Sequence, residues 1–151
     1  KNILNDFSFL FVKKPGDESK YFQQIISELE AVPGLKFDVC ENLTQSQMWA
    51  TIKSSELTYM VPKSDGTPNT ALECMASKTP FIMGDLNYNE ELFGGVSLIA
   101  DLSTSKSLTD KIILALKDYP KKCLDLGFNK VSEFGSREIE MSKLERLYES
   151  L

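Results

Sequence analysis

Short runs of apolar residues alternate along this chain with segments in which apolar residues recur every three or four positions. The short runs predict five strands, at residues 7–12, 35–40, 57–62, 80–84 and 96–100. In the first run Phe7, Phe9 and Phe11 alternate with other residues, so they should fill one face of a strand.

Helices are predicted between these runs. Helical spacing before the second strand links Phe22, Ile25, Ile26 and Leu29, and Pro33-Gly34 should end that helix. A capping box of Thr44 and Gln47 predicts the start of the next helix, whose apolar face carries Met48, Trp49 and Ile52. We therefore expect Trp49 to pack in the core, with stacking on a nucleobase as the alternative.

Four further helical regions follow. Thr67 as N-cap and Pro68 as first helical residue predict a helix that turns Leu72, Met75 and Ala76 toward the core. The last part of the chain should be helical over residues 107–119, then up to residue 134, and again over 136–151.

Strand–helix alternation with short connections predicts an α/β, Rossmann-like fold, with a mostly parallel sheet of about five strands and helices on both faces. A chain of 151 residues suits one domain, so residues 1–151 are expected to form a single unit. Ligands of such folds bind at the carboxyl ends of the strands. That edge should carry residues 13–16, Glu41, residues 64–69 and residues 85–89.

Composition narrows the function classes. The net charge of −5 argues against binding to nucleic acid, and the lack of histidine excludes a Ser-His-Asp triad and a histidine-ligated metal, so no metal site is expected. Cys40, Cys74 and Cys123 form no CxxC motif, which favours reduced, mostly buried thiols in a cytoplasmic protein. No apolar run reaches the roughly 18–20 residues that span a bilayer.

The segment 64–76 combines groups that suit a phosphorylated sugar. It turns at Gly66 and enters a helix, whose start attracts phosphate through backbone amides. Those amides belong to Thr67, Asn69 and Thr70, because proline has none. Asp65 and Glu73 could border one crevice and accept hydrogen bonds from hydroxyl groups. A plain turn, a helix cap and a solvated Glu73 would explain the same residues without a ligand.

The same segment resembles the signature of the retaining group 1 type of GT-B glycosyltransferases. That signature is an acidic residue, seven others and a glutamate, followed by Met-Ala and a short strand. Residues 64–69 and 72–76 match it, with Asp65 where the family usually has glutamate. Residues 79–82 resemble the strand that follows, and residues 89–92 resemble the Asn-x-Glu-hydrophobic turn after it.

The resemblance implies a donor domain that binds a nucleotide-diphosphate sugar as substrate, without a cofactor. Asp65 would lie by the donor sugar and Glu73 would hold the ribose hydroxyls, and these two are the expected catalytic residues. The diphosphate or sugar would meet Gly66, Thr67, Pro68, Asn69 and Thr70. The loops with Lys14 and Glu41 would lie by the nucleobase. The acceptor, a saccharide or a lipid-linked molecule, would bind chiefly to an N-terminal Rossmann-like domain, in the cytoplasm or at the inner membrane surface.

The chain departs from the family in several places. It is expected to lack the N-terminal domain and the first strand–helix unit of the donor domain, whose loop supplies an arginine and a lysine. Lys13 and Lys14 follow a different strand and could be solvated turn charges. Lys78 stands where the family commonly has glycine after the signature helix. A residue other than glycine lowers stability there by up to about 1 kcal/mol if its backbone is left-handed.

The last helix offers a further expectation. In the resembled family the C-terminal helix crosses onto the N-terminal domain. Without that domain, part of its apolar surface should be exposed or packed on a neighbouring molecule. The residues concerned are Ile139, Leu144, Leu147, Tyr148 and Leu151.

Two other functions remain open at this point. A non-catalytic nucleotide-sugar-binding or regulatory module could use the same scaffold, because fold alone does not fix function. A phospho-acceptor receiver domain is disfavoured, since Lys13-Lys14 follows the first strand where a receiver needs acids.

Overall fold

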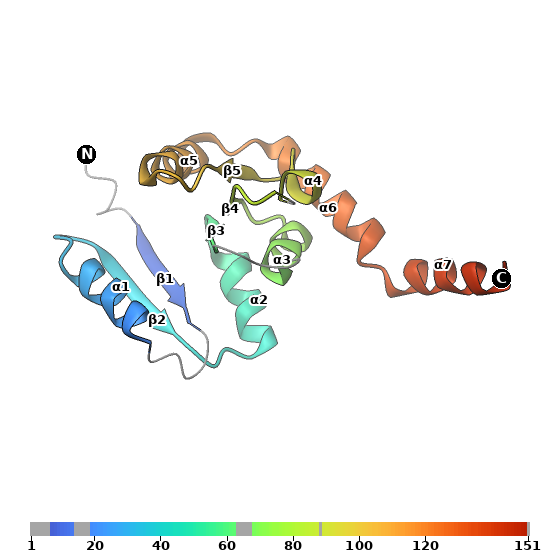
Figure 1. The fold of residues 1–151 in the computed structure, drawn as a ribbon, viewed down its shortest axis with the longest axis horizontal. Helices are drawn as coiled ribbons and strands as arrows, with labels where there is room; N and C mark the ends of the chain where they lie inside the picture. Colours follow the sequence, from blue (N-terminus) through green and yellow to red (C-terminus); the bar gives the residue numbers. More distant parts are fainter. Residues whose placement is uncertain (1–6, 14–18, 63–67, 88, 151) are drawn as a thin grey trace. The chain divides into compact units, whose positions relative to one another are not determined.

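A computed structural model describes residues 7–13, 19–62, 68–87 and 89–150 of the chain. The chain divides into two compact units, Lys1–Met48 and Trp49–Leu151. Five strands lie in the described part, and every strand pair is parallel. The predicted α/β class is therefore confirmed, with the strands hydrogen-bonded as two small sheets (Figure 1).

The first unit contains two strands and a helix. Strands β1 (Ser8–Val12) and β2 (Lys36–Cys40) pair in parallel, with Ser8 opposite Lys36 and Val12 opposite Cys40. Helix α1 (Lys20–Glu30) starts at the N-cap Ser19, whose hydroxyl accepts a hydrogen bond from the Phe22 amide at 3.2 Å.

The phenylalanines of β1 share one face, as their alternation predicts. Phe7, Phe9 and Phe11 are half-buried, whereas the residues between them are exposed. Phe11 meets Phe37 of β2 edge to face, with 6.1 Å between ring centroids. The Lys13 ammonium lies 5.3 Å from the centre of the Phe22 ring, so helix α1 lies over this face.

The capping box that the sequence predicts is present. The Thr44 amide donates to Gln47 Oε1 at 2.9 Å, and the Gln47 amide donates to Thr44 Oγ1 at 3.3 Å. Helix α2 (Gln45–Ser54) starts directly after this pair. The reciprocal bonds satisfy two amides that a helix start would otherwise leave unpaired.

The second unit is built on a three-stranded parallel sheet in the order β3-β4-β5. Its strands are β3 (Thr58–Met60), β4 (Phe81–Gly84) and β5 (Leu98–Ala100). Its helices after α2 are α3 (Asn69–Ser77), α4 (Asn89–Phe93), α5 (Ser105–Asp118), α6 (Lys121–Phe134) and α7 (Arg137–Glu149). All four residues of β4 are buried, as expected for a central strand with both faces covered.

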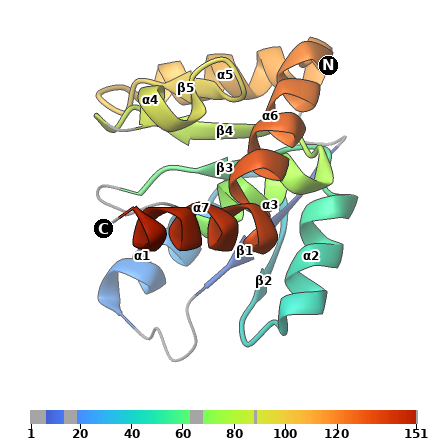
Figure 2. The same cartoon turned by 90° about the vertical axis from the view of Figure 1, so that its right-hand side faces the viewer.

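Helices cover both faces of this sheet (Figure 2). On one face, α5 packs over a core of Ile82, Ala100 and Ala115. The Tyr119 hydroxyl, just after α5, donates to the carbonyls of Phe81 at 3.1 Å and Val96 at 3.3 Å. Burial raises the pKa of Tyr119 to about 12.

Helix α3 lies over the other face and packs closely against α6. It buries Ala71, Cys74 and Met75. A Cβ atom at Gly127 of α6 would lie only 3.2 Å from Met75 Cγ. Glycine is less favourable than alanine inside a helix by about 1 kcal/mol. The close approach of Met75 explains why α6 nevertheless has glycine at position 127.

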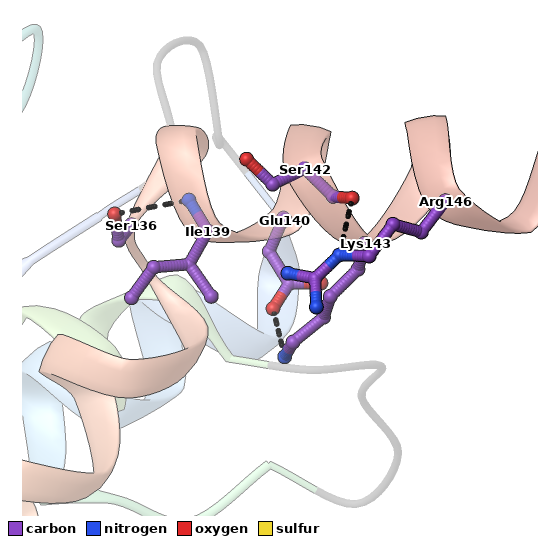
Figure 3. A network of polar contacts seen from close by, with 6 residues as sticks. All are labelled: Ser136, Ile139, Glu140, Ser142, Lys143 and Arg146. Atoms are coloured by element: carbon purple, nitrogen blue, oxygen red, sulfur yellow. Dashed lines mark hydrogen bonds and ion pairs between the residues drawn. The ribbon is translucent and has the colours of Figure 1, made fainter.

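Helix α7 follows α6 and exposes its apolar side chains. Its N-cap Ser136 accepts from the Ile139 amide, and Lys143 forms an ion pair with Glu140 at 2.7 Å (Figure 3). Exposed residues are Ile139, Met141, Leu144, Leu147 and Tyr148, while Leu151 lies outside the described residues. The expected exposure of apolar surface on this helix is thus confirmed for the part that the structure describes.

Lys78 ends α3 in the left-handed conformation, with φ 55° and ψ 36°. The sequence raised this possibility because the family often has glycine there. The Lys78 side chain forms an ion pair with Asp125 of α6 at 2.7 Å and lies 4.9 Å from the centre of the Phe128 ring. These contacts offset part of the backbone strain and tie the end of α3 to α6.

A pair of substitutions separates backbone strain from side-chain contacts at this position. Both Lys78→Gly and Lys78→Ala remove the contacts with Asp125 and Phe128, but only glycine adopts a positive φ without strain. We expect the glycine variant to exceed the alanine variant by about 1 kcal/mol in free energy of unfolding. Urea denaturation of the two variants measures this difference, and equal stability would contradict the left-handed assignment.

Candidate functional site

The start of α3 differs by one residue from the sequence prediction. Pro68 is the N-cap, with φ −75° and ψ 110°, and not the first helical residue. Its extended ψ places it outside the helix, because proline fixes φ but leaves ψ free. The Pro68 carbonyl accepts from the Ala71 amide at 3.0 Å and the Leu72 amide at 3.4 Å. The amides of Asn69 and Thr70 therefore precede the first bond within the helix.

Several predicted site residues lie outside the described part of the chain: Lys14, Asp65, Gly66 and Thr67. Among the others, Pro68 is buried, Asn69 is exposed and Thr70 is half-buried. The described part of the helix start therefore offers two accessible residues to a ligand.

Glu73 lies one helical turn after this start and is half-buried. It borders a groove of about 540 Å³ whose walls are α2, α3, α6 and the residues just after α6. The lining residues are Trp49, Leu72, Glu73, Ala76, Phe128, Val131, Ser132, Gly135 and Ser136. All of them belong to the second unit. The groove is largely open to solvent, and its lining is mainly apolar.

Trp49 is not a core residue, so the expectation of core packing is wrong. It is 41% exposed, and its side chain lines the groove. Helix α2 instead buries Ile52, which is 3% exposed. The Thr79 hydroxyl donates to the Ile52 carbonyl at 3.1 Å, which holds this end of α2 against the segment after α3. Apolar spacing alone cannot tell which residue of a short helix faces inward.

Glu41 and Lys13 form an ion pair at 3.1 Å in the first unit. The Lys13 side chain is only 12% exposed and also lies over the Phe22 ring. For Lys13 the interpretation as a solvated turn charge is therefore wrong. Its cation stabilises the junction of β1 and α1, whereas Glu41 remains exposed.

Cys74 is fully buried in α3. Burial raises the pKa of its thiol to about 12, although a hydrogen bond with Thr58 acts in the opposite direction. A thiol in this state is a poor nucleophile. This agrees with the interpretation of Cys74 as a small buried hydrophobe. All three cysteines are free, but Cys40 and Cys123 are only half-buried, which corrects the expectation of mostly buried thiols.

Asn89 is a residue whose burial the sequence analysis did not predict. It begins α4 and is 1% exposed. Its Nδ2 donates to the Gly84 carbonyl at the carboxyl end of β4, at 2.7 Å. Its Oδ1 is buried without a hydrogen-bond partner in the described structure. The motif around residues 89–92 was noted in the sequence, but as a turn and not as a buried polar anchor.

Asp85 directly follows β4 and is exposed. Its amide donates to the Ala100 carbonyl at 2.8 Å, so it extends the ladder between β4 and β5. In the described ranges, no three histidine, cysteine or acidic side chains gather in a way that could hold a metal ion. Within the same ranges, no helix has the length and hydropathy needed to cross a membrane.

Several solved structures share this fold, and two of them have low sequence identity to this chain. One is a GtfA/B complex, with a TM-score of 0.61 and 15% identity over 97% of this chain and 36% of that chain. The other is the pneumococcal O-GlcNAc transferase GtfA in complex with UDP and GlcNAc. It has a TM-score of 0.60 and 15% identity over 96% of this chain and 36% of that chain.

The likeness supports the expected GT-B-like fold. The chain corresponds to about a third of each neighbour, 36% in both cases. No family model and no curated protein matches the sequence.

The buried thiol leads to a labelling prediction. With a pKa of about 12, only about one Cys74 side chain in ten thousand is a thiolate at pH 8, and the side chain is shielded from solvent. In the folded protein, iodoacetamide should modify Cys40 and Cys123 and leave Cys74 unmodified, as read by peptide mass spectrometry. Cys74 should react fully in urea. Its modification at the rate of the other two under native conditions would contradict this packing of α3.

Proposed function

We propose that this chain is the donor-binding part of a glycosyltransferase whose substrate is a nucleotide-diphosphate sugar. The observation that carries the proposal is the arrangement on α3. The amides of Asn69 and Thr70 lie at its start, and Glu73 borders a groove one turn later. A helix start attracts phosphate, and a carboxylate accepts hydrogen bonds from a pair of hydroxyls.

The fold likeness adds support from a separate direction. One of the neighbours is a transferase in complex with UDP and GlcNAc. Its fold is shared over 96% of this chain, although the identity of 15% is too low to carry over the substrate. We therefore propose a nucleotide sugar as the ligand class.

In the proposed mechanism, this chain orients the donor for transfer with retention of configuration. The start of α3 would hold the diphosphate and Glu73 the ribose hydroxyls. Asp65 would lie by the donor sugar. An N-terminal Rossmann-like domain would bind the acceptor, a saccharide or a lipid-linked molecule. The cytoplasm or the inner membrane surface is the proposed location. The alternative is a non-catalytic module that binds a nucleotide sugar without transferring it.

The role of Glu73 is tested by removing its charge. Glu73→Gln should weaken binding of uridine diphosphate by about 1.5–3 kcal/mol, because a charge-assisted hydrogen bond is lost. Isothermal titration calorimetry measures the dissociation constants. Glu133→Gln is the matched control, since Glu133 is an exposed carboxylate of α6 that does not line the groove. Equal affinity of wild type and Glu73→Gln would contradict the proposed role, and nucleoside diphosphates with other bases extend the test.

We also expect the 151-residue chain to bind a nucleoside diphosphate weakly and to transfer no sugar by itself. Holding two reactants in the right geometry can contribute roughly 7–11 kcal/mol to a reaction, and that contribution is lost when nothing holds the acceptor. Incubation with radiolabelled nucleotide sugars and candidate saccharides tests this expectation. Efficient transfer by the chain alone would show that it already binds the acceptor. Failure to bind any nucleotide up to millimolar concentration would contradict the donor site.

A further inference from the structure

The groove beside Glu73 has an unusual composition for a solvent-facing surface. Most of its lining is apolar, and among the described residues that line it Glu73 is the one that carries a charge. Two aromatic side chains face it, Trp49 from α2 and Phe128 from α6. An apolar groove with a few polar groups at its border is typical of a site for a small organic molecule.

Trp49 is held in place without being buried. Ile52, one turn later on α2, is buried, and its carbonyl accepts from the Thr79 hydroxyl at 3.1 Å. The part of α2 from Trp49 onward is therefore held within the second unit, whereas the indole remains 41% exposed. Exposure of a large aromatic surface to water is unfavourable, and a ligand stacked on the indole would remove part of that surface from water.

The second aromatic residue is already engaged. The Lys78 ammonium lies 4.9 Å from the centre of the Phe128 ring, and Phe128 is 39% exposed. Among the described residues, no cation lies over Trp49 in this way. Trp49 is therefore the aromatic side chain of the groove that is best placed to stack on a flat ligand.

We propose that this groove is a nucleobase subsite in which Trp49 stacks on the base of the nucleotide. This inference rests on the proposed function and adds a residue and a location to it. A nucleoside fits the chemistry of the groove, because it joins a flat aromatic ring to a pair of hydroxyl groups. The ring would lie on Trp49 and the hydroxyl pair on Glu73.

Together, α3 and α2 offer a contact for each part of a nucleotide. Asn69 and Thr70 begin α3, Glu73 follows after about one turn and lines the groove together with Leu72 and Ala76, and Trp49 faces the same groove from α2. The phosphates would lie at the start of α3, the ribose at Glu73 and the base at Trp49. The family resemblance of residues 64–76 implies a base beside the loops after β1 and β2 instead. Only a base in the groove would stack on Trp49.

The chain contains a single tryptophan, which makes the test direct. Uridine diphosphate should quench the fluorescence of Trp49, with the same dissociation constant that calorimetry gives. Pyrophosphate and ribose 5-phosphate should bind without quenching, because they lack a base. Binding of uridine diphosphate without any change in fluorescence would overturn the subsite and leave the proposed function intact. Quenching by pyrophosphate to the same extent would also overturn it, since the signal would then not report a stacked base.

Variants of the same residue provide a second measurement. Trp49→Ala should raise the dissociation constant for uridine diphosphate by roughly 5- to 100-fold, and Trp49→Phe should keep most of the affinity, because stacking needs an aromatic face. Phe134→Ala is the control, since Phe134 is exposed on α6 but does not line the groove. Circular dichroism verifies that each variant folds.

The two proposals fail in different ways. Unchanged affinity of Trp49→Ala, together with a loss in Glu73→Gln, would overturn the base subsite alone. Unchanged affinity in both variants would show that the nucleotide does not bind in this groove. That result would overturn both the base subsite and the proposed role of Glu73. Absence of nucleotide binding by the wild-type chain would overturn both the subsite and the proposed function.

Discussion

Burial of the inner face of α3 is the constraint on which the second unit depends. Ala71 and Cys74 are fully buried and Met75 is 3% exposed, so this face is closed between the sheet and α6. Successive residues of a helix turn by about 100°, and the side chain of Glu73 therefore leaves the helix away from the buried face. The same packing that stabilises the unit thus turns the candidate ligand residue toward the groove.

Much of the fold follows from local signals in the sequence. The phenylalanines that alternate in β1 and the apolar run of β4 predicted their strands because a strand has a period of two and a central strand is buried on both faces. The Thr44–Gln47 capping box was predictable because it is local. Helix α4 was not, since five residues are too few to show a period. Which face of α2 turns inward was not predictable either, because tertiary contacts of Ile52 decide it.

The candidate site was predictable to a smaller extent. Glu73 could be singled out from the spacing of two acidic residues, and the structure places it at a groove. The groove itself could not, because its walls come from three helices that are distant in the sequence. The buried amide of Asn89 was also missed, since its burial depends on the Gly84 carbonyl at the end of a neighbouring strand. Asp65 and the adjacent loop lie outside the described residues, so their roles stay predictions.

Helix α7 has a consequence for how the chain can be engineered. Within the described structure, both partners of each side-chain hydrogen bond and of the ion pair of residues 136–150 lie in that segment. For example, Arg146 Nε donates to the Ser142 carbonyl. Truncation after Ser136 would thus remove α7, while Gly135 and Ser136 stay in the groove wall and the Gly135 amide keeps its bond to the Val131 carbonyl of α6. Residues 137–150 can therefore be deleted, or replaced by an affinity tag, while the groove residues are studied.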